Sequence, residues 1–380
     1  MKFTRLAAGR RRSALALTAV SAVALALAAC SSPSSGGGAS GGGAAPGASS
    51  GGALTIADVA PFSGPDASLG PTYLASCYGA TSAINAAGGV DGHQLTCKSV
   101  DTRGDPADAV PAVNQMFAST SSLALVIGCT SDEAASVVPI INAHKMAMFC
   151  MTGQSEFDSV HYPYFYRLVP PDLEESYAMV AIAQQLHYTR IALAFGNDIG
   201  SQTFIQPAIS PAFFKSAAAA VGAADFTANF HADNLVTETS GPAYQAFSAA
   251  LLSQQGKVPG ATGNFTTYLS APGGVHLYDG INLAALAMIE SKSTSPSVYG
   301  PDILTIGDGS PGAKACYSFS SCASLLKAGK AIQYAGPGGV TSFDSFHDST
   351  GIFQIDTYRA NGSVNVTGNL TAAQLRALSG

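Results

Sequence analysis

The sequence has little basic charge. It contains 18 Lys and Arg against 24 Asp and Glu, and five of the cations fall within the first 12 residues. A chain cut after residue 29 therefore keeps 13 cations, for a net charge of about −11. Nucleic acids and anionic lipid surfaces require a basic protein surface, so both are excluded as partners. Charged residues make up only 11% of the chain, which predicts a surface rich in Ser, Thr, Gly and Ala.

The sequence also lacks the motifs of common enzymes and metal sites. No Cys-x-x-Cys pair occurs and the seven histidines are scattered, so we predict no metal ion. Gly-x-Ser-x-Gly occurs only in the Ser/Gly/Ala stretch, at 38–42 and 47–51, where no strand or helix is predicted around it to form a nucleophile elbow. His161 and His187 have no evident catalytic partners in the sequence. Gly307–Gly312 fits Gly-x-Gly-x-x-Gly, but Pro311 lies inside it and no acidic residue lies near position 330. We interpret it as a loop and predict a non-enzymatic protein without a cofactor.

The first 29 residues have the pattern of an export signal. A positively charged start precedes the apolar, alanine-rich stretch 13–29, which ends in Leu-Ala-Ala before Cys30. A cysteine at this place is typical of bacterial lipoproteins, in which Cys30 would carry the lipid that anchors the chain to the membrane. The alternatives are an ordinary signal with a chance cysteine, or a membrane span, for which the apolar run is short.

Residues 30–53 are predicted to be a flexible linker. After Cys30 they contain only Ser, Pro, Gly and Ala, and such a chain has a root-mean-square reach of roughly 25 Å. The folded part is expected to begin near Leu54. It then has about 325 residues, more than one typical domain.

Six cysteines follow Cys30, an even number that suggests disulfides in an exported chain. Six cysteines allow about 15 pairings, so the assignment is a ranking. Cys316 and Cys322 close a short loop, while the others lie on neighbouring predicted elements. The pairs ranked first are Cys77 with Cys97, Cys129 with Cys150, and Cys316 with Cys322.

Strands and helices alternate from Leu54 onward. Apolar or β-branched strands are predicted at 54–62, 93–101, 123–129, 146–151 and 190–196, with helices between them at 72–86, 105–119, 131–144 and 174–187. The run "LALVIGC" is apolar throughout, as expected of a parallel strand covered on both faces. This alternation indicates an α/β fold with a parallel sheet.

The alternation stops after residue 196. Up to Val275 the only strand candidate is "NLVTET", and "QPAISPAFF" places Pro207 and Pro211 in an otherwise helical run. Pro207 is expected to end one helix and Ser210-Pro211 to begin another. We interpret the joint as an internal deletion at 209–211, which predicts fewer than four parallel strands in the second lobe of the protein.

Several segments, taken in order, resemble a known family. "APFSG", "AINAAGGVDGHQL", "VDTRGDPADAV", "VIGCTSDEAASVVPIINAHKMAMF", "YFYRLVPPD" and "YDGINLAALAM" are similar to the Leu/Ile/Val-binding lipoproteins of bacterial ABC importers. The resemblance covers residues 54–200 well and 275–360 less closely. It implies the type I periplasmic-binding-protein fold, in which two doubly wound lobes close around a solute that is passed to a membrane permease. Lobe 1 would be 54–168 and 275–343, and the reduced lobe 2 would be 169–274 and 344–380.

The candidate ligand site lies where two predicted strands end. Ligands of open α/β sheets bind beyond the carboxyl ends of the strands, and a helix N-terminus offers backbone donors to a carboxylate. In the family the corresponding two loops hold the head group of an amino acid. The predicted ligand-binding residues are Ser63, Thr130, Ser131, Thr152, Gly153, Gln154, Ser155, Asn197 and Asp198.

Simpler interpretations of these residues stay open. Thr130 or Ser131 could serve only as a helix N-cap, and Ser63 could lie in a plain turn. The acidic pair Asp132-Glu133 could repel an anionic ligand or cap the helix. Relatives usually have Ser or Thr where this chain has Gly153, and an aromatic residue that often lies near position 199 is absent.

Three functions compete. The first is a lipid-anchored solute-binding protein of an ABC importer, with an amino acid or small amide as ligand and the permease as partner. The second is a degenerate relative that no longer transports solute and acts as an interaction protein of the cell envelope. The third, a secreted hydrolase, requires a histidine close to Ser131 or Ser155.

Overall fold

The computed structural model describes residues 51–187, 231–235, 237–349, 353–358, 364–371 and 374. Residues 48–380 form one compact unit. The predicted signal peptide, Cys30, most of the linker and the predicted joint at 209–211 lie outside the described residues. None of the described helices is both long enough and apolar enough to cross a bilayer.

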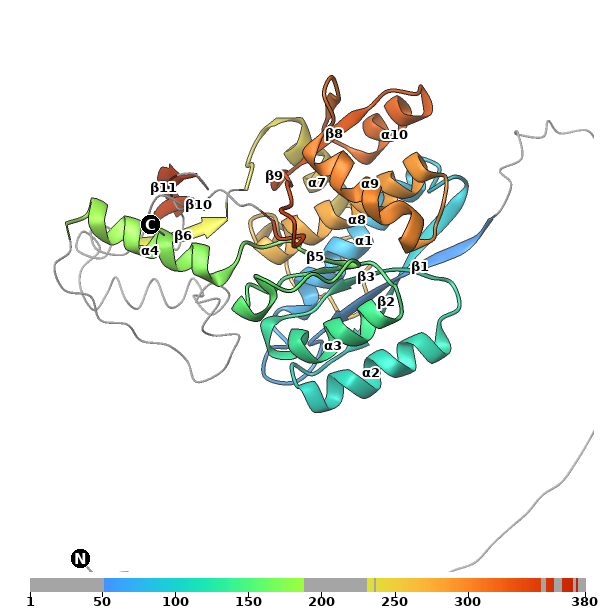
Figure 1. Cartoon of the computed structure of the whole chain (residues 1–380), viewed down its shortest axis with the longest axis horizontal. Coiled ribbons are helices and arrows are strands. Elements are labelled where there is room, and N and C mark those ends of the chain that lie inside the picture. The colour runs from blue at the N-terminus through green and yellow to red at the C-terminus, as the bar shows by residue number, and fades with distance from the viewer. Residues whose placement is uncertain are drawn as a thin grey trace, which may run out of the picture. The chain divides into compact units, whose positions relative to one another are not determined.

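Five parallel strands form the main sheet (Figure 1). They are β1 (Gly51–Ala60), β2 (His93–Asp101), β3 (Leu123–Gly128), β4 (Met148–Cys150) and β5 (Phe165–Arg167), in the order β2-β1-β3-β4-β5. Every neighbouring pair is parallel. The α/β fold with a parallel sheet is therefore confirmed.

The helices between the strands cover both faces of this sheet. They are α1 (Gly70–Ala86), α2 (Pro106–Ser119) and α3 (Ser131–Ala143). Side chains alternate between the faces of a strand, so Ile56 of β1 joins one core with α1, while Ala57 joins a second core with α2 and α3. The predicted caps of α2 occur, because Asp105 accepts a hydrogen bond from Ala107 N and Pro106 is the first helical residue.

One helix from far along the chain completes the first of these cores. Helix α8 (Pro272–Ser291) packs against α1 and against β3 and β4, and nearly all its residues are buried. A helix that is apolar on every side belongs in a protein interior. It carries the buried Asp279, which accepts hydrogen bonds from Tyr334 Oη (2.9 Å) and Gly338 N (2.8 Å).

Two smaller sheets follow in the chain. Strands β7 (Lys314–Cys316), β8 (Ile332–Gly336) and β9 (Gly339–Val340) form one of them, next to α9 (Pro296–Asp308) and α10 (Phe319–Lys327). Strands β6 (His231–Leu235), β10 (Phe353–Tyr358) and β11 (Val364–Leu370) form the other, which is antiparallel. The remaining described elements are α4 (Asp172–Gln185), α7 (Gly241–Leu252), and the 3₁₀ turns η1 (Ser155–Phe157) and η2 (Phe265–Tyr268).

The structure differs from the prediction at three places, one of which is β5, a segment that was not predicted to be a strand. Strand β1 begins at Gly51 rather than Leu54, because β2 reaches back to His93, which pairs with Gly51. The weak strand at "NLVTET" lies instead at His231–Leu235, in an antiparallel sheet. The lobe boundaries and the strand count of the second lobe stay predictions, since residues 188–230 lie outside the described part.

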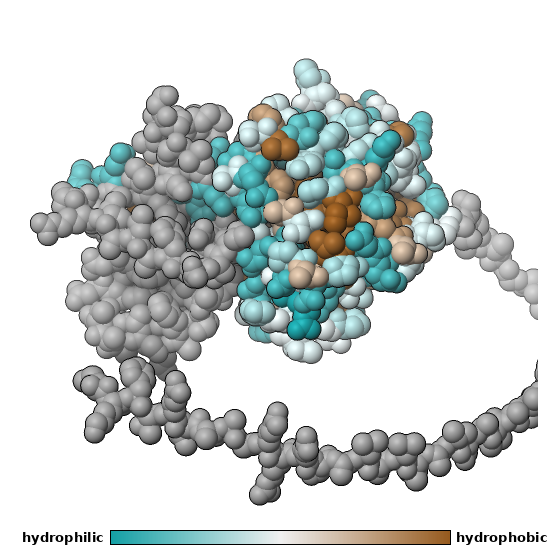
Figure 2. Space-filling model, turned by 60° about the horizontal axis from the view of Figure 1, so that its bottom comes forward, coloured by the Kyte–Doolittle hydropathy of each residue, from teal (hydrophilic) through white to brown (hydrophobic). Residues whose placement is uncertain are grey.

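The three disulfides join the pairs ranked first from the sequence. They are Cys77–Cys97, Cys129–Cys150 and Cys316–Cys322. Figure 2 shows that polar and weakly polar residues cover most of the described surface on one face, around a smaller apolar area.

Candidate functional site

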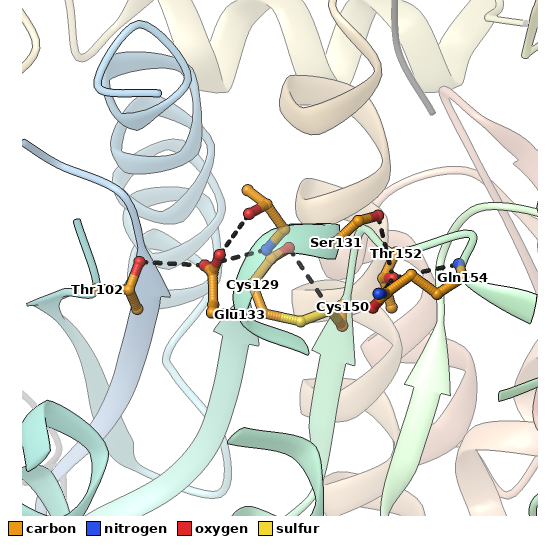
Figure 3. The surroundings of a disulfide bond; sticks show 8 residues. Thr102, Cys129, Ser131, Glu133, Cys150, Thr152 and Gln154 are labelled. Atoms are coloured by element: carbon orange, nitrogen blue, oxygen red, sulfur yellow. Dashed lines mark hydrogen bonds between the residues drawn. A yellow bond between two sulfur atoms is a disulfide. The ribbon is translucent and has the colours of Figure 1, made fainter. Parts of the chain in front are cut away.

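The candidate site lies at the carboxyl edge of the main sheet. Parallel strands all end at the same edge, so the loops after β1, β2, β3 and β4 lie next to one another there. Figure 3 shows the central part of this edge, from Thr102 to Gln154 around the Cys129–Cys150 disulfide. Its polar side chains form a nearly continuous row of hydrogen bonds.

Glu133, in the first turn of α3, holds together the loops after β2 and β3. Its carboxylate accepts hydrogen bonds from Thr130 N (3.1 Å), Thr130 Oγ1 (2.5 Å) and Thr102 Oγ1 (3.1 Å). A Thr-x-x-Glu sequence with this back-bond is a capping box. Burial raises the pKa of Glu133 even though the Thr130 bonds act against that shift. Of the two roles open for Glu133, the structure therefore gives it the capping role.

A second group joins the loops after β3 and β4. Ser131 Oγ lies 3.2 Å from Thr152 Oγ1, which donates to Gln154 Oε1 (3.2 Å) and accepts from Gln154 N (3.3 Å). The single hydroxyl hydrogen of Thr152 goes to Gln154, so Ser131 is the donor of the first bond. All three residues are buried. Within the described residues, no acceptor is found for the side-chain NH₂ of Gln154, which leaves two donors for a ligand.

Ser63 lies on the next loop and is held by Asp101. Its Oγ donates to Asp101 Oδ2 (2.5 Å), and the amides of Phe62, Ser63 and Arg103 donate to Oδ1. Partial burial of Asp101 favours the neutral acid, but the bonds from Ser63 and the amides outweigh it and lower the pKa. Ser63 is thus part of an ordered turn at the same edge, not in direct contact with Thr152.

Gly153 is packed against a carboxyl group. A Cβ atom at this position would overlap Asp172 Oδ1, and Asp172 N donates to Gly153 O (2.8 Å). Asp172 begins α4, and burial is the main cause that raises its pKa to about 6, partly offset by Arg167. The absence of a Ser or Thr side chain at position 153 therefore has a steric reason, which the sequence did not reveal.

Arg167 holds the loop after β4 in place through its hydrogen bonds. Its guanidinium is fully buried, and it donates to Gln154 O (3.0 Å), to Asp158 Oδ1 (2.5 Å) and to both oxygens of Asp348 (2.5 and 2.7 Å). Its donors are engaged within the protein, so it positions the loop rather than offering a charge to a ligand. In the sequence analysis this segment appears only among the motifs that carry the resemblance. The one available signal was an arginine in an otherwise apolar strand.

Four of the predicted site residues lie close together in the structure, and the other described ones lie apart from them. Thr130, Ser131, Thr152 and Gln154 form one buried polar group with Gly153 beside it, and Ser63 lies on a neighbouring loop. Ser155 is exposed at the start of η1. Asn197 and Asp198 lie outside the described residues.

The comparisons with known proteins agree with this architecture. Residues 53–209 match the family model of a periplasmic binding protein. A curated relative, "Leu/Ile/Val-binding protein homolog 3" of Brucella melitensis, is 30% identical over 101 residues. That match spans 26% of this chain and about a quarter (27%) of the relative.

Solved structures resemble a larger part of the chain. An ABC transporter substrate-binding protein from Desulfitobacterium hafniense aligns with a TM-score of 0.58 and 16% identity, covering 83% of this chain and 99% of that one. LivJ of Streptococcus pneumoniae, in complex with isoleucine, gives 0.57 and 15% over 84% and 99%. A solute-binding protein of R. palustris, in complex with 4-hydroxybenzoate, gives 0.61 and 12% over 84% and 97%. The resemblance stated from the ordered motifs is confirmed: residues 53–209 match the periplasmic binding protein family model, and the chain has the fold of the solved substrate-binding proteins.

Proposed function

We propose that this protein is the extracytoplasmic solute-binding component of an ABC importer, and that it binds a small solute with a carboxylate or amide group, such as an amino acid. The observation that carries the proposal is the buried polar group at the carboxyl edge of the main sheet. It lies at the N-terminus of α3, which favours negative charge, and it includes the open amide donors of Gln154.

The charges around this group support a ligand held by neutral donors. Arg167 is neutralised by Asp158 and Asp348, so in the part of the chain that the structure describes no buried cation is left for a bare anion. A carboxylate would be received by backbone amides and by Gln154. Relatives of this fold are in complex with isoleucine and with 4-hydroxybenzoate, each of which carries a carboxylate.

A calorimetric and thermal-shift screen tests the proposal. The panel consists of L-leucine, L-isoleucine, L-glutamine, acetamide and 4-hydroxybenzoate, added to the protein without its signal peptide. A solute that binds only the folded state raises the melting temperature. We expect at least one panel member to do so and to release or absorb heat. A panel without any response contradicts the proposal and favours the envelope interaction protein.

A variant pair tests the site itself. Gln154→Ala removes the open donors and is expected to weaken binding of the responding solute about tenfold, the value of one hydrogen bond to a charged group. Gln94→Ala is the matched control, since Gln94 is exposed near the opposite end of the strand layer, at the start of β2. Equal affinities of the two variants would place the ligand elsewhere.

Lipid anchoring through Cys30 is part of the same proposal. The wild-type chain, expressed in a bacterium, is expected in the membrane fraction and to incorporate labelled palmitate. Cys30→Ser is expected to do neither. A Cys30→Ser chain that is still labelled and sediments with membranes would contradict the anchor.

A further inference from the structure

The Cys129–Cys150 disulfide lies directly beneath the polar group of the candidate site. Cys129 is the residue after β3 and immediately precedes Thr130, while Cys150 is the last residue of β4. In the β3–β4 ladder Gly128 pairs with Cys150, so the bridge closes the end of that ladder. Both cysteines are fully buried, with Cα atoms 5.2 Å apart, within the usual range for a disulfide.

Besides the bridge, hydrogen bonds of the backbone and a hydroxyl pair join the two loops. Met151 N lies 3.3 Å from both Gly128 O and Cys129 O, and the hydroxyls of Ser131 and Thr152 meet at 3.2 Å. The hydroxyl contact is the outermost of these links, so its geometry depends on how the strand ends are held. Figure 3 shows the bridge between the two loops and the hydroxyl pair next to it.

The backbone at the exit of β3 is unfavourable. Gly128 and Cys129 both have positive φ values, 98° and 52°, and a left-handed conformation is disfavoured for a residue with a Cβ atom. Cys129 is nevertheless kept there, between its bond to Val59 O and the disulfide. Without the bridge, this residue gains a route to a relaxed conformation that would turn Thr130 and Ser131 away from Thr152.

We propose that the Cys129–Cys150 disulfide is a positioning element of the solute site, which aligns the donors after β3 with those after β4. This inference rests on the proposed solute-binding function. It assigns to the bridge a role in affinity, beyond the stability that any disulfide contributes.

The chain supplies a matched control for this inference. The Cys77–Cys97 disulfide has nearly the same sequence separation, 20 residues against 21, so loop closure predicts a similar effect on the unfolded state. It joins α1 to the middle of β2 rather than two strand ends. Removing either bridge is therefore expected to lower the melting temperature by a similar amount.

The test compares two double variants, Cys129→Ala/Cys150→Ala and Cys77→Ala/Cys97→Ala, well below both melting temperatures. Hydrogen exchange followed by mass spectrometry reports on residues 129–134 and 150–156 without any ligand. We expect faster exchange there only in the first variant. Its affinity for the panel solute that binds best is expected to fall about tenfold or more, as for the loss of one or more hydrogen bonds, while the control keeps wild-type affinity.

The outcomes separate this inference from the proposed function. Equal exchange of the two loops in both variants overturns the positioning role, and so does an unchanged affinity in the first variant. A wild-type protein that binds no panel solute contradicts the proposed function, whereas the exchange comparison still decides whether the bridge orders the loops. Should the first variant not fold, Cys129→Val/Cys150→Val, which leaves less empty volume in the core, is compared with Cys77→Val/Cys97→Val in the same way.

Discussion

Some buried residues of this protein lower the stability of its folded state. Asp58 of β1 is fully buried, and neither carboxyl oxygen has a hydrogen-bond partner. It faces the core that contains Ile56 and α1, where Tyr73 also lies. Burial raises its pKa well above the ordinary value, so the folded state holds this acid in its neutral form over a wide pH range.

Asp58→Val is expected to stabilise the protein by about 1–3 kcal/mol, because it removes an unsatisfied buried polar group at similar volume. A raised pKa means that the folded state retains a proton the unfolded state releases, so wild-type stability falls as pH rises above about 4. The variant lacks this part of the decline. Calorimetric unfolding from pH 4 to 8 measures both effects, and a variant less stable than wild type at pH 7 would contradict them.

Gly153→Ser is expected to destabilise the protein by about 1–3 kcal/mol, since the new side chain overlaps Asp172 Oδ1 and forces a local shift. Gly52→Ser is the control, because nothing lies within 4 Å of a Cβ atom there. Denaturant unfolding compares the two. Adding Asp172→Ala to Gly153→Ser should restore part of the loss, and no restoration would mean that the overlap is not the cause.

Among the elements, β5 is the one whose role sequence reasoning did not reveal. The strands, the cap of α2 and the disulfide pairs follow from local signals, such as an apolar run, an Asp-Pro start or the position of a cysteine. An arginine in the apolar strand β5 does not indicate which residue it pairs with, since its partner Asp348 is 181 residues away. Likewise Thr130 and Glu133 could be read as a capping box, but the link from Thr102 to Glu133 depends on the order of strands in the sheet.

Asp348→Asn is expected to lower stability by about 3–5 kcal/mol, because it breaks a buried ion pair and weakens the support of β5. Asp108→Asn is the same chemical change in an exposed ion pair. Asp108 pairs with Arg103, and the side chains of Arg103 and Asp108 are 60% and 54% exposed. That change should cost less than about 1 kcal/mol. Urea unfolding measures the free energy of unfolding of both variants. Similar losses of stability would show that the buried Arg167–Asp348 pair contributes no more than the exposed pair.

At the scale of the whole molecule, buried titrating groups set the pH range of greatest stability. Burial raises the pKa of Asp279 to about 8, and burial lowers the pKa of His276 to about 4. The raised acid makes stability fall as pH rises from about 4 to 8, while the lowered histidine makes stability rise from pH 4 to about 6.5. The two effects oppose each other below pH 6.5, and above it the effect of Asp279 is no longer offset by His276.

The melting temperature is therefore expected to decline between pH 6.5 and 8. In Asp279→Asn, which keeps a polar side chain of the same shape, this decline should be smaller. Differential scanning calorimetry at closely spaced pH values measures it. A wild-type melting temperature that is level or rising over this interval would be inconsistent with a protonated Asp279.

The long separation in sequence between the main sheet and helix α8 has a consequence for biosynthesis. One face of that sheet is complete only when Pro272–Ser291 has been made, although the last of its five strands ends at Arg167. A nascent chain that stops between these points has α1 but not α8 on that face, so part of the apolar surface of its strands is uncovered. Such intermediates are prone to aggregate. The order of the elements thus delays compaction until most of the polypeptide exists. If the chain is exported in an extended state, as we propose, this delay keeps it able to pass through the membrane. It also makes truncation before residue 272 more damaging than the loss of the final strand.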